Sequence, residues 1–357
     1  MVSGAMRGDT HLDTEAEDFL PFAVGDVEPS GSFIHVFDDA ALAVVMREMD
    51  TMADFVDYLL AREDAIRGGR VGVAASESEL VAAYLLSMTD DGRHHIPSST
   101  AFGGGPFDAL HFPTGGYQDL KNHPQYQAKR QADRDAKAWD DLIRIFSHHI
   151  LAGTSVTVAG YAPEAGVAER ALRAMAMENR MSRRALGYAF KDALRKAERS
   201  DQDRYARVVM PFEGCADPEC GYIFLILAYR APWITAKGYD YYRDGRVGFL
   251  KAYCQVALYQ NRHLKRMVGI ALDASRRVTG RKGGSEDLMM LEITDWTSEL
   301  EHETKELQRE AEILLPERLR AARLSTDEFP TLGSAAARTP NRRERRKAKA
   351  QARQKRP

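Results

Sequence analysis

The sequence has little cysteine, which is abundant in small secreted proteins, and none of the long apolar segments that mark membrane proteins. Only three of its 357 residues are cysteines, an odd and sparse set that does not make a disulfide framework. No apolar run reaches the roughly 18–20 residues that a membrane helix needs. The acidic N-terminus also lacks the basic and then apolar order of a signal peptide. We therefore expect a cytoplasmic protein with reduced thiols and no membrane partner.

The sequence also lacks the short motifs of the common catalytic and nucleotide-binding sites. It contains no Walker A loop, no Gly-x-Gly-x-x-Gly after an expected strand, no Gly-x-Ser-x-Gly elbow and no pair of Cys-x-x-Cys motifs. Cys215 and Cys220 supply only two of the four ligands of a structural zinc, so we predict no metal site. The histidines near the 90–126 region lack metal-motif spacing, and we interpret them as solvated or packed in a loop: His94, His95, His111 and His123. The cofactor is unknown, and whether the chain is an enzyme stays open.

Charge of the two signs is separated along the chain, although the net charge is only −2. Residues 1–66 hold fifteen Asp or Glu and three Arg, whereas residues 338–357 hold ten Lys or Arg and one Glu. Each Lys or Arg that reaches a phosphate releases a counterion, so this basic tail is expected to bind RNA or DNA without regard to sequence. The alternative is a terminus that only aids solubility. The tail residues that we single out are Arg342, Arg343, Arg345, Arg346 and Lys347.

Apolar periodicity predicts a regular order of helices and strands. The densest apolar run, 221–230, is expected to form a strand buried on both faces. Shorter runs at 205–211, 267–272 and 287–293 predict three more strands. Helical spacing is clear around 139–150, 237–260 and 296–314, and Thr51–Asp54 and Ser76–Glu79 have the spacing of a capping box. This order predicts an α+β fold, with a helical N-terminal half and a mixed, mostly antiparallel sheet with covering helices in the C-terminal half.

Changes in composition predict four regions. Residues 1–30 are interpreted as a disordered acidic lead-in, and residues 31–150 as a mainly helical region with a Gly/Pro-rich loop at 90–126. Residues 164–316 are expected to form the α+β region. Residues 317–357 are expected to be a linker followed by a basic disordered tail.

A helix expected from 164 to 199 carries a basic stripe. At about 100° per residue, one face collects four basic side chains: Arg180, Arg184, Lys191 and Arg195. We predict that they contact nucleic acid, with a solvated helix face as the simpler interpretation. Asn179 and Arg183 point into the apolar sector instead. The functional interpretation is a phosphate or carboxylate contact in a cleft. The structural interpretation, which we favour, is either an ion pair under the sheet or an interrupted helix.

Acidic residues at the ends of the last two expected strands are the weak catalytic candidates. Asp273 ends one strand, and Glu286 and Asp287 begin the next. A metal-dependent hydrolase or nuclease needs two or three converging carboxylates. No Glu-x-Lys follows a suitably placed acid, so we favour ordinary surface charge.

Five segments resemble a widespread family of uncharacterised bacterial proteins. They are 33–63 (FIHVFDDAALAVVMREMDTMADFVDYLLARE), 138–143 (AWDDLI), 222–227, 242–254 and the run 267–273 with 284–297 (GSEDLMMLEITDWT). The similarity spans about residues 17–330 and leaves the basic tail outside. The resemblance implies a bacterial, cytosolic protein of one continuous architecture. It implies no activity and no catalytic residues.

Three functions follow as hypotheses. The first is a nucleic-acid-associated binding or accessory protein that uses the basic tail and the basic stripe. The second is a metal-dependent hydrolase or nuclease that uses Asp273, Glu286 and Asp287. The third is a protein-interaction module whose acidic N-terminal half binds a basic protein partner.

Overall fold

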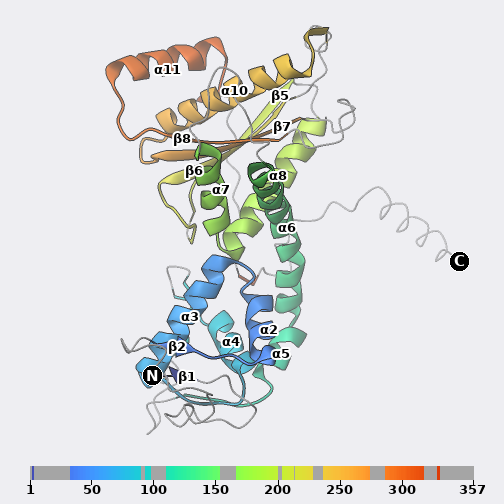
Figure 1. Cartoon of the computed structure of the whole chain (residues 1–357), viewed down its shortest axis with the longest axis vertical. Helices are drawn as coiled ribbons and strands as arrows, with labels where there is room; N and C mark the ends of the chain where they lie inside the picture. The colour runs from blue at the N-terminus through green and yellow to red at the C-terminus, as the bar shows by residue number, and fades with distance from the viewer. Residues whose placement is uncertain are drawn as a thin grey trace, which may run out of the picture.

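The computed structural model of the chain describes residues 2–3, 33–89, 93–97, 110–152, 166–199, 203–212, 214–227, 236–273, 286–316 and 328–329. Within these ranges the protein has an α+β fold, with helices in the N-terminal half and a four-stranded mixed sheet in the C-terminal half (Figure 1). The predicted fold class is confirmed. The disordered lead-in predicted for 1–30 lies outside the described residues except for 2–3, which form a short strand. The linker and disordered tail predicted for 317–357 also lie outside them except for 328–329, where Glu328 is buried. No helix in the described ranges combines the length and the apolar character that crossing a bilayer requires.

The N-terminal half is built from short helices around its own apolar core, which includes Val45, Tyr58 and Leu80. The elements are β1 (Val2–Ser3), β2 (Ile34–His35), α2 (Asp39–Glu48), α3 (Met52–Arg67), β3 (Val71–Ala74), α4 (Glu77–Leu86), β4 (Leu110–Phe112) and α5 (Gly116–Asn122). β1 pairs with β2, and β3 with β4, both in parallel.

Side chains fix the starts of two of these helices. Asp38 caps α2 by accepting the amide of Ala41 at 2.7 Å, and Thr51 caps α3 by accepting the amide of Asp54 at 3.1 Å. The capping box predicted for Ser76 is wrong, because the Ser76 side chain makes no cap bond to α4.

Glu79, the other half of that expected box, serves a distant helix. Its carboxylate accepts the amides of Gly115 and Tyr117, at 3.1 and 2.9 Å, at the start of α5. Part of the loop predicted for 90–126 is therefore a strand, a short helix and the start of α6 at Pro124. A capping carboxylate from 36 residues away cannot be read from local spacing.

The helix α6 (Pro124–Leu151) belongs to both apolar cores. Near its start, Tyr126 packs into the N-terminal core. About four to six turns later, Trp139, Leu142 and Phe146 pack into the core beneath the sheet. Figure 1 shows α6 running from the N-terminal helices to the sheet. The boundary between the regions predicted at 31–150 and 164–316 stays a prediction. α6 precedes it in the sequence and packs into both cores.

The sheet has the order β5-β6-β7-β8, with bounds Arg204–Val209, Cys220–Leu227, Arg266–Asp273 and Asp287–Glu292. β6 and β7 are parallel and are connected by α10 (Tyr239–Gln260), while β5 and β8 are antiparallel to their neighbours. All eight residues of β6 are buried, which confirms the predicted central strand. Its alternate side chains pack towards α6, α7 (Val167–Met177) and α8 (Arg180–Arg199) on one face, and towards α10 on the other. The last helix, α11 (Ser298–Glu310), packs on α10.

The expected long helix of 164–199 is interrupted, which is one of the two structural interpretations favoured for Asn179 and Arg183. α7 ends at Met177 and α8 begins at Arg180. α8 then lies against α6 so closely that a Cβ on Gly187 would be 2.0 Å from the carbonyl oxygen of Asp135. This contact and the break together place the first turn of α8 against the N-terminal helices.

Candidate functional site

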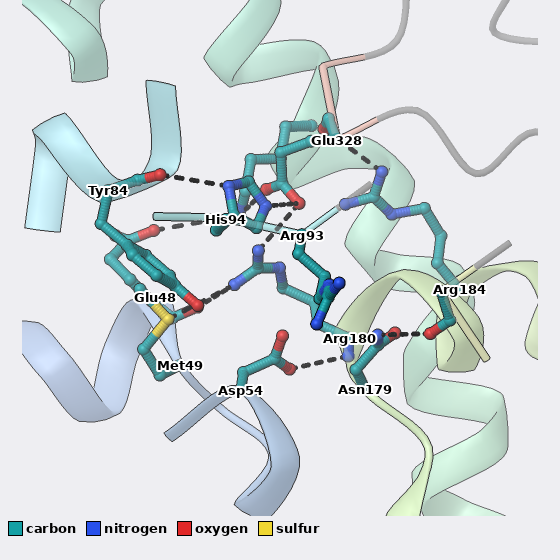
Figure 2. A network of polar contacts seen from close by, with 12 residues as sticks. Glu48, Met49, Asp54, Tyr84, Arg93, His94, Asn179, Arg180, Arg184 and Glu328 are labelled. Atoms are coloured by element: carbon teal, nitrogen blue, oxygen red, sulfur yellow. Dashed lines mark hydrogen bonds and ion pairs between the residues drawn. The ribbon is translucent and has the colours of Figure 1, made fainter. Parts of the chain in front are cut away.

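Charged side chains are buried together where the N-terminal helices, α6, the start of α8 and residues 328–329 meet (Figure 2). We call this group the Glu328 centre. It consists of Glu48, Asp54, His94, Lys129, Asp133, Arg180, Arg184 and Glu328. Charged residues are almost never fully buried unless they are paired. The Glu328 centre is therefore the strongest candidate for a site in the described part of the chain.

Glu328 lies at the middle of the centre and is 2% exposed. Its Oε2 accepts a hydrogen bond from Nη2 of Arg180 at 2.8 Å and lies 3.5 Å from Nε2 of His94. Its Oε1 lies 3.5 Å from Nζ of Lys129, and its main-chain oxygen accepts from Nη1 of Arg184 at 3.3 Å. Burial alone raises the pKa of Glu328, but Arg180, His94 and Lys129 outweigh it and hold that pKa well below its usual range. Glu328 is therefore ionised inside the protein.

Arg180 joins three segments of the chain. Its amide donates to Oδ2 of Asp54 in α3 at 2.7 Å, and its Nη1 donates to the carbonyl oxygen of Glu48 at the end of α2. Its Nη2 bonds Glu328. Burial lowers the pKa of Arg180, but the charges of Glu328 and Asp54 raise it further than burial lowers it. Arg180 is thus a fixed cation that ties α2, α3 and the C-terminal segment to α8.

Lys129 and Asp133 bring α6 into the centre. Lys129 is completely buried, with Nζ 3.2 Å from Oδ2 of Asp133 and 3.9 Å from Oε2 of Glu48. Asp133 also accepts from Nε of Arg184 at 3.1 Å. Three Lys or Arg side chains thus face four carboxylates, and the buried charges nearly balance.

Glu48 is held by two tyrosines as well as by charge. Its Oε1 accepts from the hydroxyls of Tyr117 in α5 and Tyr126 in α6, each at 2.7 Å. Burial, followed by this contact with Glu48, raises the pKa of the Tyr117 hydroxyl. The tyrosines therefore act as neutral donors that keep Glu48 in position.

The Glu328 centre is incompletely hydrogen-bonded. Within the described ranges, four of its buried atoms have no hydrogen-bond partner: Oε2 of Glu48, Nε2 of His94, Nε of Arg180 and Oε1 of Glu328. A buried polar atom without a partner costs about 1–3 kcal/mol, so most native networks satisfy nearly all of theirs. Three of these four atoms still have ion-pair contacts that are longer than a hydrogen bond. Oε2 of Glu48 and Oε1 of Glu328 lie 3.9 and 3.5 Å from Nζ of Lys129, and Nε2 of His94 lies 3.5 Å from Oε2 of Glu328.

The predicted basic stripe of α8 does not form one surface. Arg180 and Arg184 lie inside the Glu328 centre, 2% and 6% exposed. Lys191 and Arg195 remain at the surface, where Lys191 binds Asp135 at 2.9 Å and Arg195 binds Asp192 at 3.0 Å. Helical angles place the four residues on one side of α8. They do not show that α6 packs against part of that side. The five singled-out tail residues, from Arg342 to Lys347, lie outside the described ranges.

Asn179 and Arg183 form structural contacts at the break between α7 and α8. Oδ1 of Asn179 accepts the amide of Ser182 at 2.9 Å. Arg183 donates to Asp140 at 2.8 Å and to the carbonyl oxygens of residues 176 and 178. Of the two favoured structural interpretations, the interrupted helix is confirmed. The ion pair of Arg183 with Asp140 is partly exposed, because the Asp140 side chain is 48% exposed.

The three acidic candidates, Asp273, Glu286 and Asp287, lie at the same end of the neighbouring strands β7 and β8. All three are buried, so the favoured interpretation of ordinary surface charge is wrong. Asp287 is 1% exposed and accepts from Nε of Arg243 at 2.9 Å and from Nε of Arg246 at 2.6 Å. Asp273 ends β7 and Glu286 precedes β8. Among the described residues, no three His, Cys, Asp or Glu side chains are placed to hold a metal ion. The two arginines neutralise Asp287, which favours a structural role for it.

The cysteines near the β5–β6 turn are poorly suited to act as nucleophiles. Burial raises the pKa of Cys220 to about 12 and also raises that of Cys215. The thiolate, not the thiol, is the reactive form. Next to them, the hydroxyl of Tyr222 donates to Glu178 at 2.7 Å, and burial raises the pKa of Glu178.

Sequence reasoning missed Glu48, Lys129 and Glu328. It singled out His94 only as a solvated or loop-packed histidine, whereas its Nε2 lies 3.5 Å from Oε2 of Glu328. Glu328 falls in the stretch interpreted as a linker, where the only signal is the apolar Phe329 beside it. Lys129 and Asp133 have the i, i+4 spacing of an ordinary surface ion pair. Their burial arises from helices that lie far apart in the sequence.

Comparison with known proteins places no relative beside this chain, since no family model, no curated protein and no solved structure matches it. The resemblance to a bacterial family stays a prediction.

Proposed function

We propose that the chain is a non-enzymatic binding protein that associates with RNA or DNA through its basic tail, residues 338–357. One observation carries the proposal: Glu328 is anchored in the Glu328 centre only ten positions before Arg338, the first basic residue of the tail. The anchored Glu328 thereby ties the start of the tail to the folded body. An extended chain spans at most about 3.6 Å per residue, so the tail begins within roughly 36 Å of the anchor.

The charge distribution assigns the binding to the tail. With ten Lys or Arg and one Glu, residues 338–357 carry a net charge of +9, so the remainder of the chain carries −11. An acidic body repels a polyanion at long range, whereas the tail attracts one. Lys191 and Arg195, the exposed part of the predicted stripe, already have carboxylate partners in the body.

The pairing of Asp287 weighs against the hydrolase hypothesis. Arg243 and Arg246 occupy both of its carboxylate oxygens, which are the atoms that a metal-dependent site would use. The hydrolase stays the second hypothesis. The third hypothesis, a basic protein partner for the N-terminal half, rests on the fifteen Asp or Glu of residues 1–66. In the same half, α2 and α3 expose five large apolar side chains: Leu42, Met46, Met52, Val56 and Leu60.

The proposal is tested by fluorescence anisotropy with labelled 30-nucleotide RNA and single-stranded DNA, for the full chain and for residues 1–337. We expect truncation to weaken binding at least tenfold, because it removes ten of the phosphate-seeking cations. A matched control replaces exposed body cations instead, as in Arg144→Gln with Arg309→Gln, and should leave the affinity nearly unchanged.

Two outcomes would contradict the proposal. Equal affinity of the full chain and the truncated chain would place binding in the body. Cleavage of the labelled strand on addition of magnesium, lost in Asp287→Asn, would favour the hydrolase.

A further inference from the structure

We infer that the outer edge of β8 pairs with the same edge of a second copy of this chain, in an antiparallel arrangement that joins the two four-stranded sheets. β8 (Asp287–Glu292) is the last strand in the sheet order β5-β6-β7-β8, so one of its edges has no neighbouring strand among the described residues. The inference does not depend on whether the basic tail binds nucleic acid.

The outer edge of β8 presents the main-chain groups of alternate residues. Just after the strand, the amide of Ile293 donates to the carbonyl oxygen of Lys265 at 2.9 Å, and the two residues lie opposite each other in the register of β8 with β7. Opposite residues of an antiparallel ladder alternate between hydrogen-bonded and non-hydrogen-bonded pairs. Positions 287, 289 and 291 therefore bond to β7. The residues that direct their amide and carbonyl groups outward, to which no described main chain bonds, are Leu288, Met290 and Glu292.

β8 lacks the features that usually keep an edge strand from pairing. Such strands carry a lysine or a proline, or contain a bulge. β8 has four consecutive apolar residues, 288–291, and it follows β7 without a shift of register. Its two charged residues stand at its ends, and Asp287 is buried. The opposite edge strand, β5, carries Arg204 and Arg207, so β8 is the edge better suited to accept a further strand.

Side chains on both faces of β8 are suited to such pairing. Leu288 and Met290 pack into the core that includes α7, and Met289 and Leu291 pack into the core that includes α10. All of them except Leu288 remain partly exposed at the edge. A further strand would extend both apolar layers, and the flexible methionine side chain adapts readily to a new neighbour.

A second copy of β8 fits this edge about a two-fold axis at Met290. Antiparallel pairing about the axis places Met290 opposite its own counterpart, and Leu288 opposite Glu292 of the second copy. These are the residues whose main-chain groups point outward, so each pair can exchange both hydrogen bonds. On the other face Met289 lies opposite Leu291. The same patch thus serves both subunits, as a two-fold symmetric interface requires.

The acidic residues at the ends of β8 favour this register. Like charges directly opposite each other destabilise a sheet. With the axis at Met290, Glu292 lies opposite Leu288 and Asp287 lies opposite an apolar residue, so no two acids face each other. An axis at Met289 would place Glu292 opposite Glu286. The charges of the strand are therefore compatible with self-pairing in one central register.

Pairing of a single strand makes a small interface. Interfaces below about 1,200 Å² are typical of weak and transient association. We therefore expect a dimer that forms at high protein concentration and dissociates on dilution.

The test combines sedimentation velocity of the wild type over a concentration series with cysteine trapping. Opposite residues of a hydrogen-bonded antiparallel pair have Cα atoms about 5.5 Å apart, which is within the range of about 4.4–6.8 Å that a disulfide spans. Mild oxidation of Met290→Cys should therefore yield a covalent dimer on a non-reducing gel. The matched control is Glu292→Cys, whose thiol is more exposed but whose counterpart lies four positions along the pair, roughly 14 Å away. It should yield no more dimer than the wild type, whose three free cysteines report the background.

Three outcomes would overturn the inference. A wild type that stays monomeric at high concentration would show that another segment of the chain, or a strand of another protein, is the occupant of this edge. A wild-type dimer that Met290→Cys does not trap, or equal trapping of Met290→Cys and Glu292→Cys, would place the association on another surface.

Hydrogen exchange of the wild type replaces the trapping experiment if Met290→Cys does not fold. The outward amides of Leu288, Met290 and Glu292 should exchange more slowly as the protein concentration rises, because pairing protects them. Exchange that does not change with concentration at these three amides would also overturn the inference.

Discussion

Buried charge decides the behaviour of individual residues in this protein. Moving a carboxylate from water into a protein costs several kcal/mol, which only good partners offset. Glu328 obtains them from Arg180 and Lys129, and the pKa of Glu328 falls well below its usual range because these charges outweigh the effect of burial. Its contribution to stability is therefore present above about pH 4.5, the ordinary range of a glutamate, and is lost as the pH falls.

Removing the Glu328 carboxylate should destabilise the fold. Glu328→Ala leaves Arg180 and Lys129 buried with fewer partners, and breaking a buried ion pair costs about 3–5 kcal/mol. Urea unfolding at pH 7 in chloride buffer measures the loss, with the exposed Glu303→Ala as the control. A change below about 1 kcal/mol would show that the centre does not hold Glu328 as described.

Protonation of His35 should destabilise the protein at a higher pH than protonation of Glu328 does. Burial and the nearby Arg62 lower the pKa of His35 from 6.5 to about 4, and Nδ1 of His35 lies 3.2 Å from Nη1 of Arg62, so it has to accept. In the unfolded chain His35 becomes protonated near pH 6.5, whereas in the folded chain it becomes protonated only near pH 4. Stability should thus decline as the pH falls from 6.5 to 4.

The matched variant His35→Phe should decline less over the same range. Unfolding free energies at half-unit steps between pH 6.5 and 5 isolate this effect, because most carboxylates are still ionised there. His35 is half-buried, so the difference in proton uptake should be a fraction of one proton. Parallel curves for the two proteins would contradict the assignment.

At the scale of elements, the packing of α8 on α6 determines where the Glu328 centre can form. Gly187 allows the two helices to touch, since its Cβ position lies 2.0 Å from the carbonyl oxygen of Asp135. The same approach brings Asp133 to Arg184. The absence of a side chain at Gly187 thus determines the geometry of the Glu328 centre, whose Arg180 lies about two turns earlier in α8.

Gly187→Ala should therefore cost stability although alanine is the better helix former. Overpacking of this kind costs typically 1–3 kcal/mol, and the clash here is with backbone, so we expect about 3 kcal/mol. The control is Gly248→Ala in α10, where the added methyl meets no atom within 4 Å. That variant should gain up to about 1 kcal/mol of stability, as helix propensity predicts. Equal midpoints of thermal unfolding for the two variants would refute the packing argument.

At the scale of the whole molecule, sequence patterns predicted the elements better than their assembly. The strand β6 and the caps Asp38 and Thr51 are local features, and local spacing identified them. The Glu328 centre joins residues that lie up to about 280 positions apart, such as Glu48 and Glu328, and no periodicity connects them. Helical angles correctly grouped Arg180 with Arg184. Only the fold shows that this group faces inward.

The whole-molecule account places an acidic body at the root of a basic tail, and the salt dependence of RNA binding tests it most directly. For single strands, the slope of log affinity against log salt is about −0.7 for each cation that contacts a phosphate, so ten cations allow a slope of up to about −7. We predict a steep slope for the full chain and a slope near zero, with weak binding, for residues 1–337. The same steep slope in both proteins would contradict the account.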